Sequence, residues 1–409
     1  MLCLKVFTVI YSTTILFLCF RSALLFGLKS SYLLIILFYL IFIFPYISDA
    51  FLRVDFKDFP GFYSSFDDLN TNLIFCLFII YNISVFWFFR GKSKLDFSIG
   101  QSFKSINYVY ALLSFLPLFI FAFAPNKYKY LIYGGDWVRD FSEIDYIFSS
   151  YLNIAAVLSA VLCSFLIFKF YKKSLILSIL MIVILFFDFY INGKRGIVIL
   201  SFVCLSLVSF FYFKRLKSLG LILAMFFLLI IYNSWYQGNV RDFNSDVPLV
   251  VKYENLRIDY SRDQRVKMAI YANINPEEIK ILEYPGQSYL FYLTFYMPRE
   301  LWLDKPLPYS QYFTSALYLT ESKMWGWGMS TSIFDEVIAN FGFFGLVFLP
   351  FFLLYLLRKS RKYSKYFELY TLFLILILFM LQMISFMFLY VLWIVVLFIF
   401  IFRGGKKGG

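Results

Sequence analysis

The sequence predicts an all-α polytopic membrane protein with about eleven transmembrane helices, in a range of roughly ten to twelve. Hydrophobic residues make up 61% of the 409 residues and aromatic residues 23%, which is more apolar surface than a soluble domain can bury. Apolar windows of membrane-spanning length recur along the chain, and clusters of Lys and Arg occupy alternate connections between them. The net charge of +13 therefore reflects membrane topology and does not indicate a nucleic-acid-binding groove.

Each apolar window predicts one membrane helix. The windows cover residues 5–20, 32–48, 69–89, 106–124, 146–168, 174–191, 196–213, 219–236, 338–357, 367–384 and 386–402. The basic clusters between them place the C-terminus in the cytoplasm, and eleven spans then place the N-terminus outside. If the short first window lies in the membrane interface instead, the chain has ten spans and a cytoplasmic N-terminus.

The spans divide the chain into four parts. Residues 1–236 hold eight membrane helices, residues 237–337 form an extracytoplasmic loop subdomain, residues 338–403 hold three more helices, and residues 404–409 form a flexible tail. Short helices are expected in the loop. One begins at Asn275, because Pro276 suits a first helical position and acidic residues follow it. Ser332 and Asp335 have the spacing of a capping box, which predicts the start of the next span.

The loop carries ten Lys and Arg residues against thirteen Asp and Glu residues. One interpretation is a solvated cap with weak surface ion pairs. The other is that several arginines converge on an anionic ligand, because the planar guanidinium binds phosphate in a bidentate manner. The loop arginines are Arg241, Arg257, Arg262, Arg265 and Arg299.

The turn Asn192-Gly-Lys-Arg-Gly196 places two cations on the outer side, against the positive-inside tendency. Either Lys194 and Arg195 snorkel to lipid headgroups, or Arg195 binds a lipid-linked pyrophosphate at the membrane surface. Asp188 lies just below in the same span and is expected either to have a function or to neutralise one of these cations.

Two further groups of residues are candidates for chemistry. Arg299 and Lys305 stand among prolines beside Trp302, which predicts either a rigid surface turn or a preorganised cationic clamp. Trp302 either stacks on a sugar or anchors the loop in the interface. Asp335 is expected to cap a helix, and Glu336, one residue further, is the candidate general base.

Several chemistries lack the residues they need. The chain has no histidine, and none of its five cysteines falls in the long polar loop. No glycine-rich phosphate loop and no HExxH motif occurs. No cofactor and no metal site is predicted, and no nucleic acid is expected as a partner.

Three segments resemble the Wzy-type O-antigen polymerases, which join oligosaccharide repeat units in bacterial inner membranes. They are Gly193-Lys-Arg-Gly196, Met297-Pro-Arg-Glu-Leu-Trp-Leu-Asp-Lys-Pro306 and Ser330-Thr-Ser-Ile-Phe-Asp-Glu-Val-Ile-Ala-Asn-Phe-Gly-Phe-Phe-Gly345. The plan of many spans, one long late periplasmic loop and closing spans covers nearly the whole chain. The related ligases use a periplasmic histidine, which this chain lacks.

The resemblance implies a metal-independent, GT-C-like glycosyltransferase of the Gram-negative inner membrane, in lipopolysaccharide biosynthesis. It implies transfer of a growing glycan from undecaprenyl pyrophosphate to the non-reducing end of a lipid-linked repeat unit, on the periplasmic side. A polysaccharide chain-length regulator is a candidate partner besides membrane lipid. The family's pyrophosphate-binding arginines correspond to Arg195 and Arg299, and less directly to the loop arginines Arg241, Arg257, Arg262 and Arg265.

The expected mechanism is an inverting displacement in which Glu336 accepts the proton of the attacking hydroxyl and cations stabilise the departing diphosphate. A retaining scheme with two carboxylates is an alternative. An O-antigen ligase-like transferase and a flippase for lipid-linked oligosaccharides are the other functions considered. The mechanism requires arginines that are distant in sequence to gather at a lipid-accessible opening.

Overall fold

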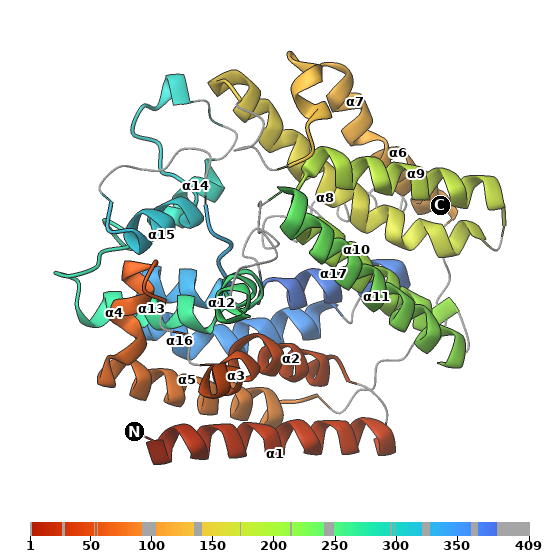
Figure 1. The fold of residues 1–409 in the computed structure, drawn as a ribbon. Coiled ribbons are helices and arrows are strands. Elements are labelled where there is room, and N and C mark those ends of the chain that lie inside the picture. Colours follow the sequence, from red (N-terminus) through yellow and green to blue (C-terminus); the bar gives the residue numbers. More distant parts are fainter. Residues whose placement is uncertain are drawn as a thin grey trace, which may run out of the picture. The chain divides into compact units, whose positions relative to one another are not determined.

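The structure is a computed structural model. It describes residues 2–26, 29–52, 54, 56–91, 104–134, 141–171, 173–212, 215–240, 249–294, 297, 299–320, 328–360 and 367–382. The described residues form helices and connecting turns and include no strand, as predicted (Figure 1). They belong to two compact units. Unit 1 comprises Met1–Asp96, Pro248–Ser364 and Phe373–Gly409, and unit 2 comprises Phe97–Val247 and Lys365–Leu372.

Six helices in the described part of the chain are long and apolar enough to cross a membrane. They are Leu2–Ala23, Ser30–Asp49, Leu69–Phe88, Phe148–Tyr171, Leu175–Asn192 and Ile333–Ser360. Shorter apolar helices are Val109–Ala122, Arg195–Ser206 and Leu223–Tyr236. The all-helical prediction is confirmed, and the apolar helices agree with a membrane protein. The count of eleven stays a prediction, and the window at 386–402 lies outside the described residues.

Unit 1 combines the first spans with most of the polar loop. Its helices are α1 (Leu2–Phe26), α2 (Ser30–Phe38), the π-helix η1 (Tyr39–Ile43), α3 (Phe44–Leu52), α4 (Pro60–Asp67), α5 (Leu69–Phe88), α12 (Leu249–Tyr260), α13 (Asp263–Ile274), α14 (Gln287–Leu293), the 3-10 turn η3 (Arg299–Leu301), α15 (Tyr309–Leu317) and α16 (Ile333–Ser360). Helix α17 (Phe367–Phe379) begins in unit 2 and ends in unit 1.

Aromatic packing fixes the start of α16. The centroid of the Phe334 ring lies 5.6 Å from that of Phe38, 5.4 Å from that of Phe42 and 5.1 Å from that of Phe78, and each pair is arranged edge to face. Such contacts add about 0.5–1.5 kcal/mol per pair beyond burial. The capping box is confirmed, because the backbone N–H of Ser332 donates to Asp335 Oδ1 at 2.8 Å and the Asp335 N–H donates to Ser332 Oγ at 3.4 Å.

Unit 2 is formed by α6 (Lys104–Ser114), α7 (Leu116–Ala122), the 3-10 turn η2 (Lys127–Leu131), α8 (Glu143–Tyr171), α9 (Leu175–Asn192), α10 (Arg195–Tyr212) and α11 (Arg215–Val240). Helix α8 packs closely along α9, and α10 packs on α8 and α11. Ser159, Ala160 and Cys163 on α8 are fully buried, and small side chains of this kind let membrane helices approach closely.

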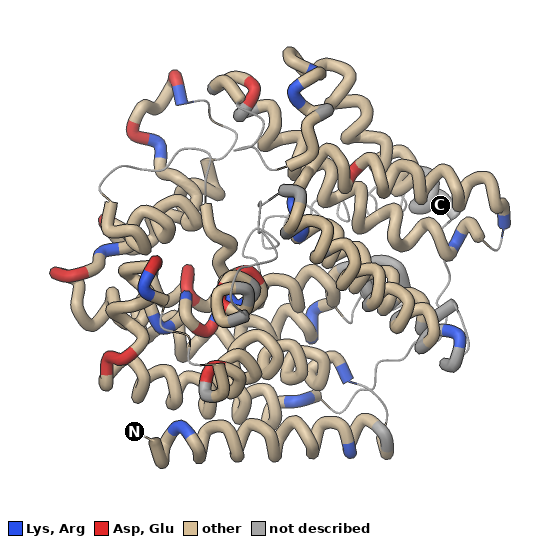
Figure 2. Tube along the Cα trace, in the orientation of Figure 1, with Lys and Arg blue, Asp and Glu red and all other residues tan. Residues whose placement is uncertain are grey.

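Helix α13 is polar and yet buried. Every residue from Asp263 to Ala272 is buried, including Arg265 and Lys267. Helices α4, α5 and α16 and the π-helix η1 pack around it. Figure 2 shows charged positions gathered around α12 and α13, whereas long stretches of α1, α5 and α8 carry none. Buried charges require internal partners, so α13 is the place in unit 1 to look for a functional site.

The expected helix start at Asn275 is wrong. Asn275 is instead the C-cap of α13, and its N–H donates to the carbonyl of Tyr271 at 2.8 Å. Pro276 follows directly, and a proline just after the C-cap cannot continue a helix. An Asn-Pro pair can stand at the start or at the end of a helix. Here it stands at the end, because the residues before it already form α13.

Helix α16 is kinked at Gly342, which has φ 57° and ψ −141°. This backbone conformation is strongly unfavourable for residues with a Cβ atom. The Asn273 side chain of α13 donates to the carbonyl of Ile338, one turn before the kink, at 3.2 Å. The buried polar helix therefore supports the break in the adjacent span.

We expect Gly342→Ala to lower the free energy of unfolding by about 1–3 kcal/mol, because alanine is strained at this φ and ψ. The measurement is the thermal unfolding midpoint in detergent. Gly220→Ala is the control, since a Cβ atom at Gly220 of α11 meets open space and alanine favours a helix. Equal midpoints for the two variants would show that the kink carries no strain.

Candidate functional site

Arg257 has no hydrogen-bond donor left for a ligand. A guanidinium has five N–H donors. Nε donates to Asp49 Oδ1 at 2.9 Å, and Nη2 donates to Asp49 Oδ2 at 2.7 Å and to Asp263 Oδ2 at 2.5 Å. Nη1 donates to Asp263 Oδ1 at 2.6 Å and also to Ser261 Oγ. All five donors are therefore used within the protein.

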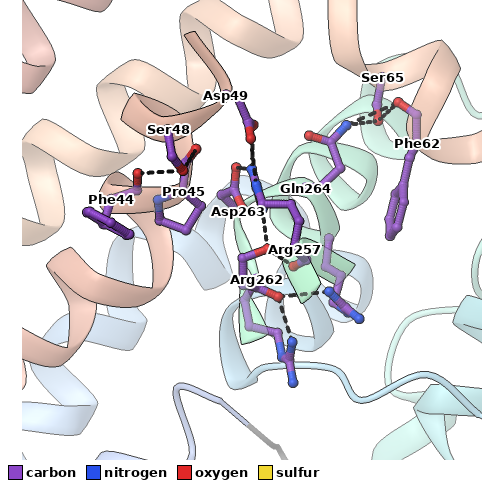
Figure 3. Close-up of polar contacts among 12 residues, drawn as sticks. Phe44, Pro45, Ser48, Asp49, Phe62, Ser65, Arg257, Arg262, Asp263 and Gln264 are labelled. Carbon is purple, nitrogen blue, oxygen red and sulfur yellow. Dashed lines mark hydrogen bonds and ion pairs between the residues drawn. The ribbon is translucent and has the colours of Figure 1, made fainter. Parts of the chain in front are cut away.

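This interaction joins three segments (Figure 3). Asp49 ends the second span, Arg257 lies on α12, and Asp263 begins α13. Figure 3 also shows Gln264 reaching toward α4, where its amide donates to the carbonyl of Phe62 at 3.1 Å. Arg257 is fully buried, and the two carboxylates raise its pKa above the ordinary value despite the opposing effect of burial.

Arg262 and Arg265 are held by backbone carbonyls. Arg262 donates to the carbonyls of Ser261 at 2.6 Å and Gln382 at 2.7 Å. Arg265 donates to the carbonyls of Ser261 at 2.8 Å and Ile258 at 2.7 Å. Three of these bonds end on residues 258–261 at the C-terminal end of α12, the negative end of its dipole.

Carbonyl groups solvate these two cations without neutralising them. Burial lowers the pKa of Arg265 to about 10, against the opposing effect of Asp335. Burial also lowers the pKa of Arg262, and the neighbouring Arg265 lowers it further. Both guanidiniums stay protonated at neutral pH, so they generate a positive potential inside unit 1. The Nε atom of Arg265 and the Oδ2 atom of Asp335 have no hydrogen-bond partner among the described residues.

The π-helix supplies another anchor for this region. The backbone N–H of Arg262 donates to the carbonyl of Ile41 at 3.3 Å. π-Helical turns inside membrane helices are rare and occur often at functional sites. The N–H of Ile333 donates to the carbonyl of Met380 at 3.0 Å, so the start of α16 is fixed as well.

Lys267 lies in an aromatic cage on α13. Its Nζ atom is 4.8 Å from the ring centroid of Tyr46, 5.2 Å from that of Phe66 and 5.3 Å from that of Phe75. The residue is 1% exposed. Burial lowers the pKa of Lys267 to about 8, which outweighs the opposite effect of Asp263.

Glu336 is buried and hydrogen-bonded. Ser288 Oγ donates to Glu336 Oε1 at 2.6 Å, and the Tyr292 hydroxyl reaches Oε2 at 3.5 Å. Asn340, one turn further on α16, donates to Ser288 Oγ and to the Glu336 carbonyl, each at 2.8 Å. Asn340 in turn accepts the N–H of Gly286 at 2.9 Å. The carboxylate predicted from sequence as a general base is thus held by two hydroxyl groups of α14.

An apolar pocket lies along the same two helices. Its volume is ≈ 430 Å³. Helix α14 contributes Tyr289 to its wall and presents Ser288 and Tyr292 to Glu336, so one short helix serves both features. The remaining wall comes from α16 on both sides of the kink: Ile333, Val337, Phe341, Phe344, Gly345, Phe348, Leu349 and Phe352.

The second cationic group, Arg299 and Lys305, binds backbone carbonyls of the same loop. Arg299 donates to the carbonyls of Lys305 at 2.8 Å and Pro306 at 3.0 Å, and Lys305 Nζ donates to the carbonyl of Met297 at 2.7 Å. Burial lowers the pKa of both side chains, and for Lys305 the nearby Arg299 adds to the effect. Trp302, predicted to contact a sugar, is half-buried in the same loop.

The remaining predicted cations lie elsewhere. Lys194 is exposed and Arg195 half-buried, in the turn between α9 and α10 of unit 2. Arg241 lies outside the described residues. Asp188 is fully buried, and neither of its carboxylate oxygens has a partner among the described residues, so a bond that neutralises Lys194 or Arg195 is absent there.

The structure therefore brings the predicted residues together in two groups within unit 1. Arg257, Arg262 and Arg265 gather in the interior, where each is at most 2% exposed, so for these three the expected gathering at a lipid-accessible opening is wrong. Arg299 gathers with Lys305. The sequence analysis missed Asn340 and Ser288 as partners of Glu336. The spacing of four residues between Glu336 and Asn340 was the available signal, since it places both on one helix face.

Comparisons of the chain with protein-family models, with curated proteins and with solved structures find no match.

We expect Arg257→Met to lower the free energy of unfolding by about 3–5 kcal/mol, because it leaves two carboxylates without their buried cation. Thermal unfolding in detergent measures the effect. Arg358→Met is the matched control: Arg358 is exposed and donates to the Phe89 carbonyl at 3.1 Å, so its loss changes stability by about 0.5 kcal/mol or less. A midpoint for Arg257→Met equal to that of the control would contradict the structural role.

Lys267 predicts a rise in stability with pH. Its folded-state pKa of about 8 lies below the ordinary value of 10.5, so between these values the unfolded chain binds more protons than the folded chain. Stability attributable to Lys267 is then constant below pH 8 and increases by up to about 1.4 kcal/mol per pH unit above it. From about pH 8 upward, the unfolding midpoint of wild type should rise relative to that of Lys267→Met, with both measured from pH 7. Parallel profiles would refute the prediction.

Proposed function

We propose that the chain is an O-antigen polymerase that transfers a growing glycan from undecaprenyl pyrophosphate to the non-reducing end of a lipid-linked repeat unit. The observation that carries the proposal is the buried Glu336 carboxylate, held by Ser288 and Tyr292 next to an apolar pocket on α16. A carboxylate for proton transfer and an apolar surface for a lipid carrier are what this reaction needs. The motifs around Arg195, Arg299 and Glu336 support the same reaction.

Glu336 acts as the general base. The bond from Tyr292 to Oε2 is the longer of its two side-chain contacts, so the acceptor hydroxyl takes that position. As the acceptor oxygen forms a bond to the anomeric carbon, its proton moves to Glu336. The bond from the anomeric carbon to the diphosphate oxygen breaks, and the diphosphate leaves with the electron pair. The attack from the opposite face inverts the anomeric configuration.

Cations stabilise the departing diphosphate in different ways. Arg299 and Lys305 are the proposed direct ligands in unit 1, whereas Arg195, Lys194 and Arg241 remain candidates through the resemblance alone. Arg262 and Arg265 contribute positive charge to the interior of unit 1, where their hydrogen bonds end on carbonyls and the carboxylates of Asp335, Asp259 and Asp263 act on them. Arg257 contributes only through the fold, because its five donors are used.

The proposed enzyme is a metal-independent, GT-C-like glycosyltransferase of the Gram-negative inner membrane with its active site toward the periplasm. The six described helices that are long and apolar enough to cross a membrane support a membrane location. The reaction is driven by cleavage of the bond between the anomeric carbon and the diphosphate of the donor, so it requires no nucleotide.

The test is to mix purified protein with lipid-linked repeat units without nucleotide and to separate the products by size. We expect longer lipid-linked glycans from wild type, a loss of about 10²–10⁴ in rate for Glu336→Gln, and partial activity for Glu336→Asp. Glu300→Gln is the control, because Glu300 is an exposed carboxylate of the same loop.

Each alternative gives a different product. A ligase-like transferase attaches glycan to another acceptor, and a flippase moves the repeat unit across vesicles without lengthening it. Wild-type rates for Glu336→Gln would remove Glu336 from the mechanism. Absence of longer lipid-linked products with wild type would overturn the proposed polymerase.

A further inference from the structure

Unit 2 contains an aromatic cluster that the proposed mechanism does not use. Its members are Tyr133, Tyr190, Tyr232, Trp235 and Tyr236. They come from three segments: the connection after η2, the last turn of α9 and the C-terminal part of α11. Segments so far apart in sequence meet here around one central ring.

That central ring is Tyr133. Its centroid lies 5.7 Å from Tyr190, 5.3 Å from Trp235 and 6.4 Å from Tyr236. Its hydroxyl is hydrogen-bonded to the Tyr232 hydroxyl at 2.5 Å. The rings are therefore held in a defined arrangement by packing and by a polar contact.

The cluster combines a buried ring with two exposed ones. Tyr236 is 6% exposed, whereas Trp235 is 46% and Tyr190 39% exposed. Parts of the Trp235 and Tyr190 side chains thus remain exposed beside a buried ring. Rigid aromatic surfaces bind ligands with little loss of conformational entropy.

The turn at Gly193 places the cation of Arg195 beside this cluster. Gly193 adopts φ 63°, and a Cβ atom there would lie 1.8 Å from the Gly134 carbonyl oxygen, so only glycine allows the approach of the two segments. The turn ends at Arg195, whose guanidinium carbon lies 4.9 Å from the ring centroid of Tyr236. Lys194 beside it is exposed.

We propose that the aromatic cluster and Arg195 form a saccharide-binding site that holds a sugar of the lipid-linked glycan. Aromatic faces carry negative charge density, and the C–H groups on one face of a pyranose carry positive charge density, so the two stack. Phenol hydroxyls and the N–H groups of Arg195 bond to sugar hydroxyls and to acidic substituents. The choice of saccharide rests on the proposed function.

Membrane anchoring explains less of this arrangement. Aromatic residues of an interfacial belt lie at the ends of spans. Here Tyr133, a residue outside the spans, lies at the centre of the cluster. The close approach of Gly193 to Gly134 holds the segment that carries Tyr133 against the end of α9. Trp87 of unit 1 shows the simpler case: it stacks on Arg90 at 3.5 Å at the end of α5.

The test uses the intact chain in lipid nanodiscs. The probe is the repeat-unit oligosaccharide released by mild acid from the carrier lipid of the cells that produce the chain. Saturation-transfer NMR measures its affinity. We expect Trp235→Ala to weaken binding by about tenfold or more, equivalent to about 1.4 kcal/mol, and Trp235→Phe to restore part of it. Trp87→Ala, the matched control, should bind as wild type does.

Hydroxyl-radical footprinting of wild type provides a second measurement that needs no variant. The oligosaccharide should protect Trp235 and Tyr190 and leave Trp87 unprotected. Wild-type affinity in Trp235→Ala, or no protection of these rings, overturns the saccharide site. Retention of anionic lipid that changes in Trp235→Ala while saccharide affinity does not would identify a membrane anchor and overturn it as well.

The two proposals fail separately. If wild type lengthens lipid-linked repeat units and Trp235→Ala does so with unchanged KM and product length, the saccharide site falls and the polymerase stands. If wild type binds the oligosaccharide at Trp235 but makes no longer product, the site stands and the polymerase falls.

Discussion

The buried charge of Arg257 is the constraint on which unit 1 depends. A guanidinium removed from water requires acceptors for all its donors, and two carboxylates are needed to supply them here. Asp49 belongs to the second span and Asp263 to a helix of the polar loop. The loop helices α12 and α13 are consequently part of the same compact unit as the first spans.

Hydropathy predicted the six described helices that are long enough to cross a membrane, because a run of apolar side chains reports directly on its surroundings. The interior position of α13 could not be predicted in this way. Its composition resembles that of a solvated helix, and the partners that allow its burial lie far away in sequence: Asp49 is 208 residues from Arg257. Sequence patterns record neighbours along the chain, whereas neutralisation of a buried charge depends on neighbours in space.

The candidate site was partly predictable for the same reason. Ser332 and Asp335 form the expected capping box, which is a local interaction. Because Asp335 is used in the cap, the sequence indicated the next residue, Glu336, as the carboxylate available for chemistry. The sequence gives no indication that Ser288, which is 48 residues away, donates to Glu336. Asn275 and Pro276 show the limit of local signals, because the pair fits both ends of a helix and the structure uses it as an end.

The way in which Arg262 and Arg265 are held bears on function. For stability alone, a buried cation is best matched by a carboxylate or replaced by an apolar side chain. Carbonyl groups bear only partial charge, so the cations at the end of α12 keep part of their field. That field extends to Asp335, whose Oδ2 atom has no hydrogen-bond partner among the described residues. Asp259 and Asp263 also act on these two cations, so carboxylates partly balance the interior charge. In the proposed transfer negative charge develops on the departing diphosphate, and cations whose hydrogen bonds go to carbonyls suit such a reaction.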